Sequence, residues 1–169
     1  MKDDGSEATQ GERGEICVRG ATVMKGYDNQ PEDNDKSFSN GWYHTGDIGV
    51  QDEDMRLYIV DRSTEMVISG GENIYCAEVE RVLNQAPGVL ESVTFGMPDD
   101  RLGEKLIALI RTHKDSKETA ESITDFIKQK LAGYKLPAEM FLVTDALPTN
   151  AMGKVLKNEA RSVYKNLAS

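Results

Sequence analysis

The feature that constrains the fold most is an uninterrupted apolar run at residues 106–110, in the second half of the chain. A strand with one solvated face alternates apolar and polar residues, so a continuous run indicates a strand covered on both faces. Residues 119–131 follow with apolar side chains at helical spacing, and Gly133 stands just beyond them as the expected C′ residue. The pattern therefore indicates a sheet packed against helices.

Strands and helices alternate through the rest of this half, and Ser69 to Asn73 is expected to be a loop. Cys76 is expected in the loop before the next helix. The alternation predicts an α/β (α+β) domain with a sheet of at least three strands. The expected strands are residues 65–68, 93–97, 106–110 and 141–143, and the expected helices are 77–85, 119–131 and 157–167.

Residues 1–62 follow a different pattern of short strands separated by turns, which predicts a small all-β subdomain. A polar loop is expected at 29–40, a turn between His44 and Ile48, and a hairpin turn at 52–54. So few residues bury a low fraction of their surface and form a poor core alone. We therefore expect two parts, a β-rich part at 1–62 and an α/β domain at 63–169.

Charge is unevenly distributed along the chain. The formal net charge is −9, yet residues 128–169 hold 7 basic and 3 acidic side chains. An acidic chain argues against sequence-independent binding to nucleic acid, which depends on clustered Lys and Arg. The basic C-terminal stretch could meet a small phosphorylated ligand, although a solvated surface with uneven charge is the simpler explanation.

Several other kinds of protein are excluded. No apolar run approaches the roughly 18 residues of a spanning helix, and residues 1–6 do not resemble a signal peptide. Cys17 and Cys76 have neither metal nor disulfide spacing, so free thiols in a reducing cytoplasm are expected. His44 and His113 suggest no metal cluster and no nucleophile–base pair, and packing is the simpler role for His44. No metal site is therefore expected.

Common phosphate-binding loops are also absent from the sequence. Gly153-Lys154 looks like the end of a P-loop, but Val155 stands where that loop needs Ser or Thr. There is no G-x-G-x-x-G pattern either. Kinase, GTPase and dehydrogenase functions built on these loops are therefore excluded.

Four segments together carry a more specific signal. They are Gly14-Glu15-Ile16-Cys17-Val18-Arg19-Gly20 with Gly26-Tyr27; Gly41-Trp42-Tyr43-His44-Thr45-Gly46-Asp47; Asp61-Arg62 through Ser69-Gly70-Gly71-Glu72-Asn73-Ile74-Tyr75 to Glu80; and Gly133-Tyr134-Lys135-Leu136-Pro137 with Leu147-Pro148 through Gly153-Lys154. In order and spacing they resemble the C-terminal motifs of the adenylate-forming (AMP-binding) superfamily. The form of the third segment is similar to acyl-CoA synthetases, or fatty-acid–CoA ligases, rather than to peptide-synthetase adenylation domains.

The resemblance implies a carboxylate–CoA ligase that works in two steps. A carboxylate attacks ATP to give an acyl-adenylate and pyrophosphate, and the CoA thiol then displaces AMP. By resemblance Lys154 is the catalytic cation of the first step, after a flexible Gly153. A compact ammonium can bridge carboxylate and phosphate oxygens, which agrees with that role.

The resemblance also implies the binding residues. Asp47 would accept the ribose hydroxyls and Arg62 would contact the nucleotide, whereas a turn-capping Asp and an Asp61–Arg62 surface pair are the simpler readings. The hinge before a mobile lid falls at Thr64, where the family usually has Asp or Lys, and Thr149 replaces a frequent Arg. The CoA-binding loop of the second step is implied at Gly70, Gly71, Glu72 and Asn73, with a plain β-to-α connector as the alternative.

The family's nucleotide loop, adenine-contacting segment, magnesium-binding Glu and acyl pocket lie N-terminal to these motifs. The chain is therefore expected to be a C-terminal fragment that is inactive alone, whose partners are the missing N-terminal domain, ATP or AMP, CoA and a carboxylate. Mg²⁺ is implied only for the longer enzyme. A free-standing, non-catalytic module that binds CoA or an adenine nucleotide stays open, as does a partner-binding domain that has lost the chemistry.

Overall fold

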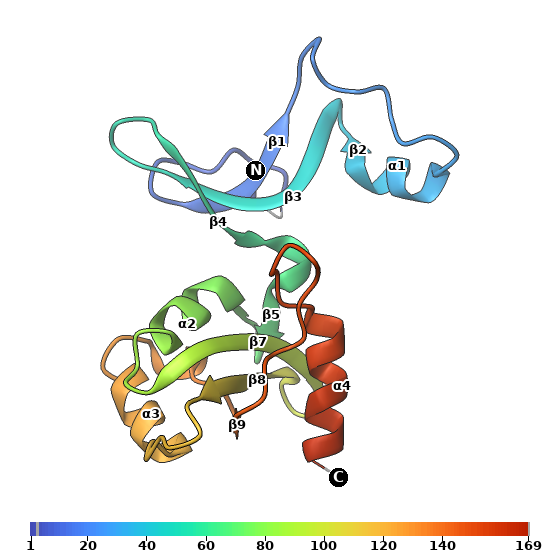
Figure 1. Ribbon diagram of the computed structural model, residues 1–169. Helices are drawn as coiled ribbons and strands as arrows, with labels where there is room; N and C mark the ends of the chain where they lie inside the picture. The colour runs from blue at the N-terminus through green and yellow to red at the C-terminus, as the bar shows by residue number, and fades with distance from the viewer. Residues whose placement is uncertain (3, 169) are drawn as a thin grey trace. The chain divides into compact units, whose positions relative to one another are not determined.

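The computed structural model describes residues 1–2 and 4–168, which divide into two compact units, Met1–Thr64 and Glu65–Ser169. Both strands and helices are present, so the mixed α/β class expected from the sequence is confirmed (Figure 1). The division lies two residues beyond the expected boundary at Arg62. No helix in the described part of the chain is long and apolar enough to cross a membrane.

The second unit is built on a five-stranded sheet with the order β6-β5-β8-β7, and β9 also pairs with β8. The β8–β9 pair is parallel, whereas the other pairs are antiparallel. The strand expected to begin at residue 65 begins at Val67, because the short 3₁₀ helix η1 (Ser63–Glu65) includes residue 65. The strands are β5 (Val67–Ser69), β6 (Glu72–Ile74), β7 (Val89–Asp99), β8 (Gly103–Thr112) and β9 (Glu139–Val143).

The apolar run at 106–110 lies in β8 and is covered on both faces, as the sequence predicts. Alternate residues Leu106, Ala108 and Ile110 belong to one buried cluster with α2 (Cys76–Leu83) and α3 (Ala120–Ile127). Ile107 and Leu109 belong to a second cluster with α4 (Lys157–Leu167). Figure 1 shows α2 and α3 on the opposite side of the sheet from α4.

The helices of this unit differ from expectation at their ends. Thr119 caps α3 in a reciprocal capping box with Ser122, but the helix ends at Ile127 rather than Leu131. The chain then tightens, with Lys130 and Leu131 both donating to the Ile127 carbonyl. Gly133 opens the 3₁₀ helix η2 (Gly133–Lys135) without a left-handed φ, so the prediction that it is a C′ residue was wrong.

The first unit is an antiparallel four-stranded sheet in which β3 (Trp42–Gln51) pairs with β1, β2 and β4. The partners are β1 (Arg13–Val18), β2 (Phe38–Ser39) and β4 (Leu57–Arg62). The hairpin turn expected at 52–54 joins β3 to β4. The prediction of a turn between His44 and Ile48 was wrong. Strand β3 runs through these residues and bends at Gly46, where φ is +73°.

A short helix, α1 (Pro31–Ser37), occupies the segment expected to be a polar loop, so this unit is not all-β. Its signals are local: Pro31 at the first helical position, Glu32 and Asp33 in the first turn, and Lys36 in the last. The helix buries none of its residues. Hydrophobic periodicity therefore could not reveal it.

Candidate functional site

Asp47 and Arg62 face one another across the β3–β4 pair, where they are register partners. The Arg62 guanidinium lies 2.9 Å from Asp47 Oδ1, and it donates to the Thr45 carbonyl at 3.3 Å. The Arg62 side chain thus pairs with Asp47, while Asp61 Oδ1 accepts the Arg62 backbone N–H. The two sequence-predicted nucleotide residues therefore form one charged pair on the sheet.

Asp47 lies within strand β3 and not in a turn. Its backbone N–H donates to Thr45 Oγ1 at 3.1 Å, and that hydroxyl donates to the Ile16 carbonyl of β1. About 29% of the Asp47 side chain stays exposed, against 52% for Arg62. An exposed carboxylate beside a guanidinium can accept hydroxyl groups and attract a phosphate.

Arg62 and Thr64 also line a cavity of about 350 Å³ within the first unit, together with Glu15, Tyr43 and His44. Thr64 is exposed and is the last residue of this unit. The sequence-predicted hinge residue thus stands at the division between the units.

The predicted CoA-binding loop is a β-hairpin rather than a loop leading straight to a helix. Ser69 pairs with Glu72, which leaves Gly70 and Gly71 as the two turn residues. Their φ values of +59° and +85° suit a type I′ turn, which needs left-handed residues at both positions. Glu72 and Asn73 lie exposed on β6. The expectation that Ser69 to Asn73 form a loop was therefore wrong, except at the turn residues Gly70 and Gly71.

Lys154 lies in a small hydrogen-bonded hairpin between the paired residues Thr149 and Val155. Asn150 closes this hairpin, since its Oδ1 accepts the backbone N–H groups of Met152 and Lys154 at 3.0 and 2.9 Å. Gly153 has φ +80° and donates to the Asn150 carbonyl, so it serves the turn geometry. The Lys154 side chain is 64% exposed and its Nζ lies 3.5 Å from Glu65 Oε1.

A half-buried network of ion pairs next to Lys154 was not predicted from the sequence. It consists of Glu65, Glu80 and Lys157. Lys157 Nζ lies 3.0 Å from Glu65 Oε2 and 3.3 Å from Glu80 Oε1, and its side chain is only 14% exposed. Glu80 also accepts the backbone N–H and the hydroxyl of Thr94. Glu65 therefore joins the exposed Lys154 to the buried Lys157.

The network shifts the pKa values of its members. Burial opposes ionisation of Glu65, but Lys157 and Lys154 outweigh it and hold the pKa of Glu65 below its usual value. Burial dominates at Glu80 and raises its pKa. Burial also opposes the charge of Lys157, yet the negative groups around it raise the pKa of Lys157 overall.

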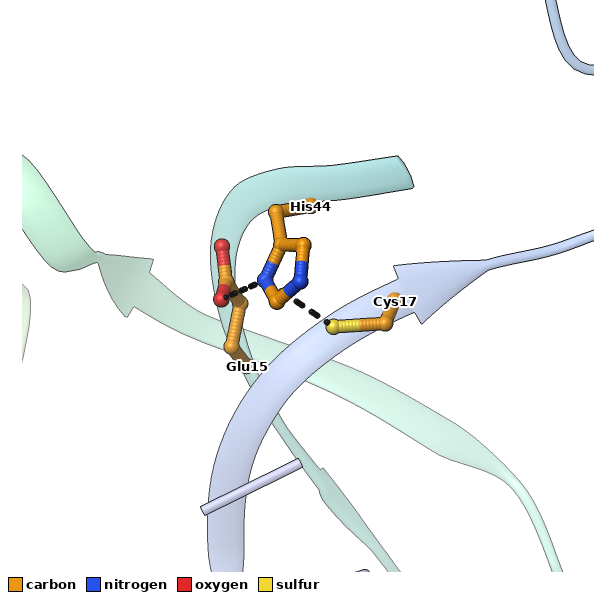
Figure 2. Close-up of side chains that lie close together, drawn as sticks. All are labelled: Glu15, Cys17 and His44. Carbon is orange, nitrogen blue, oxygen red and sulfur yellow. Dashed lines mark hydrogen bonds and ion pairs between the residues drawn. The ribbon is translucent and has the colours of Figure 1, made fainter. Parts of the chain in front are cut away.

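A second unanticipated cluster joins β1 to β3 in the first unit. His44 Nδ1 lies 2.6 Å from Glu15 Oε2 and 3.5 Å from Cys17 Sγ (Figure 2). Burial, and then the Glu15 charge, raise the pKa of the Cys17 thiol. The expectation that His44 belongs to no cluster of metal-ligating residues was wrong. The expectation that Cys76 lies in a loop was also wrong, because it is the buried first residue of α2.

Residues 78–154 match the AMP-binding enzyme C-terminal domain. They form such a domain. The chain as a whole is homologous to the C-terminal portion of adenylate-forming acyl-CoA ligases.

The relatives of this chain are named for different acids. A 2-succinylbenzoate–CoA ligase from Bacillus subtilis is 44% identical over 98% of the chain and 33% of its own length. A long-chain-fatty-acid–CoA ligase from Escherichia coli is 42% identical over 95% of the chain and 28% of its own. The structure of ATP-bound MatB from Rhodopseudomonas palustris matches 99% of the chain and 33% of its own, with 35% identity and a TM-score of 0.87. The chain thus spans about a third of these proteins.

Residues 1–2 and 4–168 hold no close group of three or more carboxylate oxygen ligands for the magnesium ion that the resemblance implies. The one group of three or more close metal-ligating side chains in that part is Glu15, Cys17 and His44. Mg²⁺ prefers an octahedron of oxygen ligands, and a thiol with an imidazole does not supply one. The Glu15–Cys17–His44 group is therefore not assigned to Mg²⁺.

Proposed function

We propose that this chain supplies the C-terminal part of an AMP-forming carboxylate–CoA ligase. Residues 1–62 would be the last β subdomain of the large nucleotide-binding domain, and 63–169 the mobile lid. The observation that supports this most is the match of nearly the whole chain to acid–CoA ligases. Fatty acids are the substrate class we place first, and a reducing cytoplasm suits the free thiols Cys17 and Cys76.

Lys154 would act in the first step. A carboxylate oxygen attacks the α-phosphorus of ATP, the bond to the β-phosphate bridging oxygen breaks, and pyrophosphate leaves. Negative oxygens gather at the α-phosphate as this happens, and a fixed ammonium stabilises that charge. The tight hairpin around Asn150 and Gly153 supports this role, because it holds Lys154 out from the surface.

Asp47 and Arg62 would hold the nucleotide. A carboxylate has two acceptor oxygens, which suits a vicinal diol such as the ribose hydroxyls. Arg62 would keep Asp47 oriented through their 2.9 Å pair and add positive charge for the phosphates. The pair lies on adjacent strands, so this binding geometry is built into the sheet.

The glycine hairpin would serve the second step. There the CoA sulfur attacks the acyl carbonyl carbon, the thiol proton is released, and AMP leaves. Two glycines at the turn let a thin pantetheine chain pass the backbone, with Glu72 and Asn73 beside it. Rotation about Thr64 would exchange the Lys154 hairpin for this one.

A graft onto a relative tests the proposal without knowledge of the natural acid. The chain replaces the corresponding third of the B. subtilis 2-succinylbenzoate–CoA ligase, and 2-succinylbenzoate-dependent ATP–pyrophosphate exchange and thioester formation are measured. We expect both activities in the graft and neither in the 169-residue chain alone. A folded graft that catalyses neither step, while the chain alone binds CoA or AMP, would favour the non-catalytic binding module.

A further inference from the structure

The Glu15–Cys17–His44 cluster brings three kinds of metal ligand to one point. Glu15 Oε2 and Cys17 Sγ both approach the same imidazole nitrogen, Nδ1 of His44 (Figure 2). All three donor atoms lie within 4.8 Å of one another. A single ring N–H can satisfy only one of the two neighbours well, whereas a cation between the three would satisfy them all.

A β-bulge creates this convergence. Along β1 the register partners of Glu15 and Cys17 are Ile48 and His44, so three residues of β1 lie opposite five of β3. The extra residues, with Gly46 at φ +73°, bend β3 and turn His44 toward β1. Backbone geometry therefore brings Glu15, Cys17 and His44 together.

The distance between Cys17 and His44 suits a small tetrahedral cation. Zn²⁺ bonds of about 2.3 Å to sulfur and 2.0–2.1 Å to nitrogen put those two atoms about 3.6 Å apart in a tetrahedron. The observed Cys17–His44 separation is 3.5 Å. The Glu15–His44 separation of 2.6 Å would have to widen by about 0.8 Å, a change that rotation of one carboxylate supplies.

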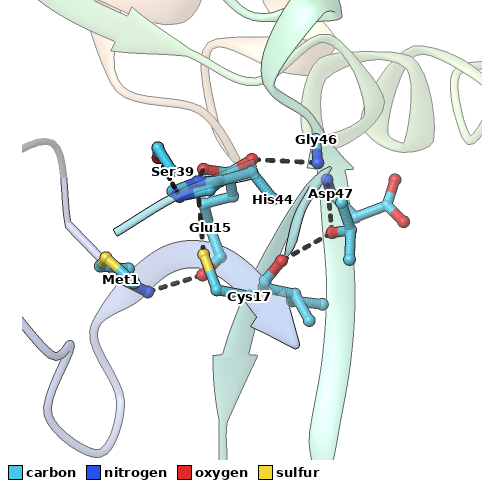
Figure 3. A network of polar contacts seen from close by, with 9 residues as sticks. Met1, Glu15, Cys17, Ser39, His44, Gly46 and Asp47 are labelled. Atoms are coloured by element: carbon cyan, nitrogen blue, oxygen red, sulfur yellow. Dashed lines mark hydrogen bonds and ion pairs between the residues drawn. The ribbon is translucent and has the colours of Figure 1, made fainter. Parts of the chain in front are cut away.

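Outer partners hold two of the three ligands in place (Figure 3). Ser39 Oγ lies 2.8 Å from His44 Nε2, the ring nitrogen that faces away from the cluster. The Gly46 backbone N–H donates to Glu15 Oε1 at 3.0 Å, which leaves Oε2 directed at His44. Metal-binding histidines usually have such a partner on the second nitrogen.

From this arrangement we infer that Glu15, Cys17 and His44 form a binding site for a borderline-soft divalent cation of the Zn²⁺ class. The thiolate and carboxylate would balance the charge of the ion, and sulfur with imidazole selects against Mg²⁺ and Ca²⁺. Glu15 and His44 line the cavity of about 350 Å³, which gives access and room for a fourth, solvent ligand. The bound ion would fasten β1 to β3 three residues before Asp47.

Cobalt titration of the 169-residue chain tests the site directly. Co²⁺ bound by a thiolate gives an ultraviolet sulfur-to-cobalt charge-transfer band, together with visible d–d bands of tetrahedral coordination. We expect saturation at a single Co²⁺ per chain, loss of the charge-transfer band in Cys17→Ser, and displacement of Co²⁺ by Zn²⁺. Competition with a chromophoric chelator then gives the Zn²⁺ affinity, which should fall at least about tenfold in His44→Gln, Glu15→Gln and Ser39→Ala.

Matched variants separate ligation from folding. Cys76→Ala removes the other thiol and His113→Asn the other imidazole, and neither should change the spectrum. Glu15→Gln keeps an oxygen for the Gly46 amide, so circular dichroism should show the native fold. The inference is overturned if the wild-type chain shows no charge-transfer band, or if Cys17→Ser keeps the band, or if the folded Glu15→Gln and His44→Gln variants bind Zn²⁺ as tightly as the wild type.

Discussion

Among buried apolar side chains in the described part of the chain, Ile48 is the one in Met1–Thr64, and all the others lie in Glu65–Ser169. The second unit has two core clusters on opposite faces of its sheet. The first unit instead relies on strand pairing and on polar contacts such as Asp47–Arg62 and Glu15–His44, and β4 exposes Leu57, Tyr58 and Ile59. We therefore expect Glu65–Ser169 to be stable by itself, whereas Met1–Thr64 presents apolar surface suited to cover by a neighbour.

Cutting the chain between the units gives the largest expected contrast. We expect residues 65–169 alone to unfold in a cooperative urea transition, and residues 1–64 alone to show none, because a core of one buried apolar side chain cannot offset chain entropy. Circular dichroism measures both. In the intact chain the single tryptophan, Trp42, reports the first unit, and its fluorescence should change at lower urea than the circular dichroism. If fluorescence and circular dichroism change at the same urea concentration, the first unit is not less stable than the second.

The same substitution in each unit sharpens the contrast. Leu109 is fully buried in β8 and Leu57 is 56% exposed on β4. Leu109→Ala should lower the free energy of unfolding by about 2–5 kcal/mol, since it leaves a cavity in a packed core. Leu57→Ala should change it by less than about 0.5 kcal/mol, as expected of surface sites. Equal losses in urea titrations would show that the first unit has a core of its own.

Turn geometry in the second unit gives an effect of intermediate size. Gly71 has φ +85° and open space around its Cβ position, so Gly71→Ala should cost about 1–2 kcal/mol through backbone strain alone. Gly133 is the control, because its Cβ position is also open and its φ is not left-handed. There Ala should stabilise by about 0.4–1 kcal/mol. Thermal melts of the two variants that shift in the same direction would refute this account of the hairpin.

The ion network below Lys154 should give the smallest effect, and one that depends on pH. The folded pKa of Glu65 lies below its ordinary value, so its contribution is present above the unfolded pKa and is lost as pH falls through the folded pKa. Glu65→Gln should therefore destabilise by about 1 kcal/mol near pH 7 and by less in acid. The raised pKa of Glu80 has the opposite sign, because its contribution is lost as pH rises. Urea midpoints of Glu65→Gln that differ from the wild type equally at all pH values would contradict this.

Regular patterns made much of the fold predictable. The apolar run in β8 and the amphipathic face of α3 were recognisable because burial imposes a period on the sequence. Helix α1 was missed since it has no buried face, and the bend at Gly46 was taken for a turn because a bulge leaves the local pattern unchanged. The end of α3 was misplaced because Leu131 is buried although it lies beyond the helix.

The candidate site was predictable only where motifs name single residues. Asp47, Arg62 and Lys154 came from such motifs, and the structure adds how each is held. The pairing of Lys157 with Glu65 and Glu80 joins positions far apart in sequence, for which no local signal exists. Glu15 and Cys17 are two residues apart on a strand, which places them on one face of the sheet. Their contact with His44 depends on the β-bulge, which the sequence did not predict.

The most direct test of the central claim is Lys154→Ala in the graft, with the half-reactions measured separately. Lys128→Ala is the matched control, because Lys128 is 54% exposed and lies 3.5 Å from Asp125, as Lys154 lies 3.5 Å from Glu65. ATP–pyrophosphate exchange should fall by about 10²–10³-fold in Lys154→Ala and stay unchanged in Lys128→Ala, while thioester formation from pre-made acyl-adenylate is kept in both. Exchange at the wild-type rate in Lys154→Ala would contradict the catalytic role of this lysine.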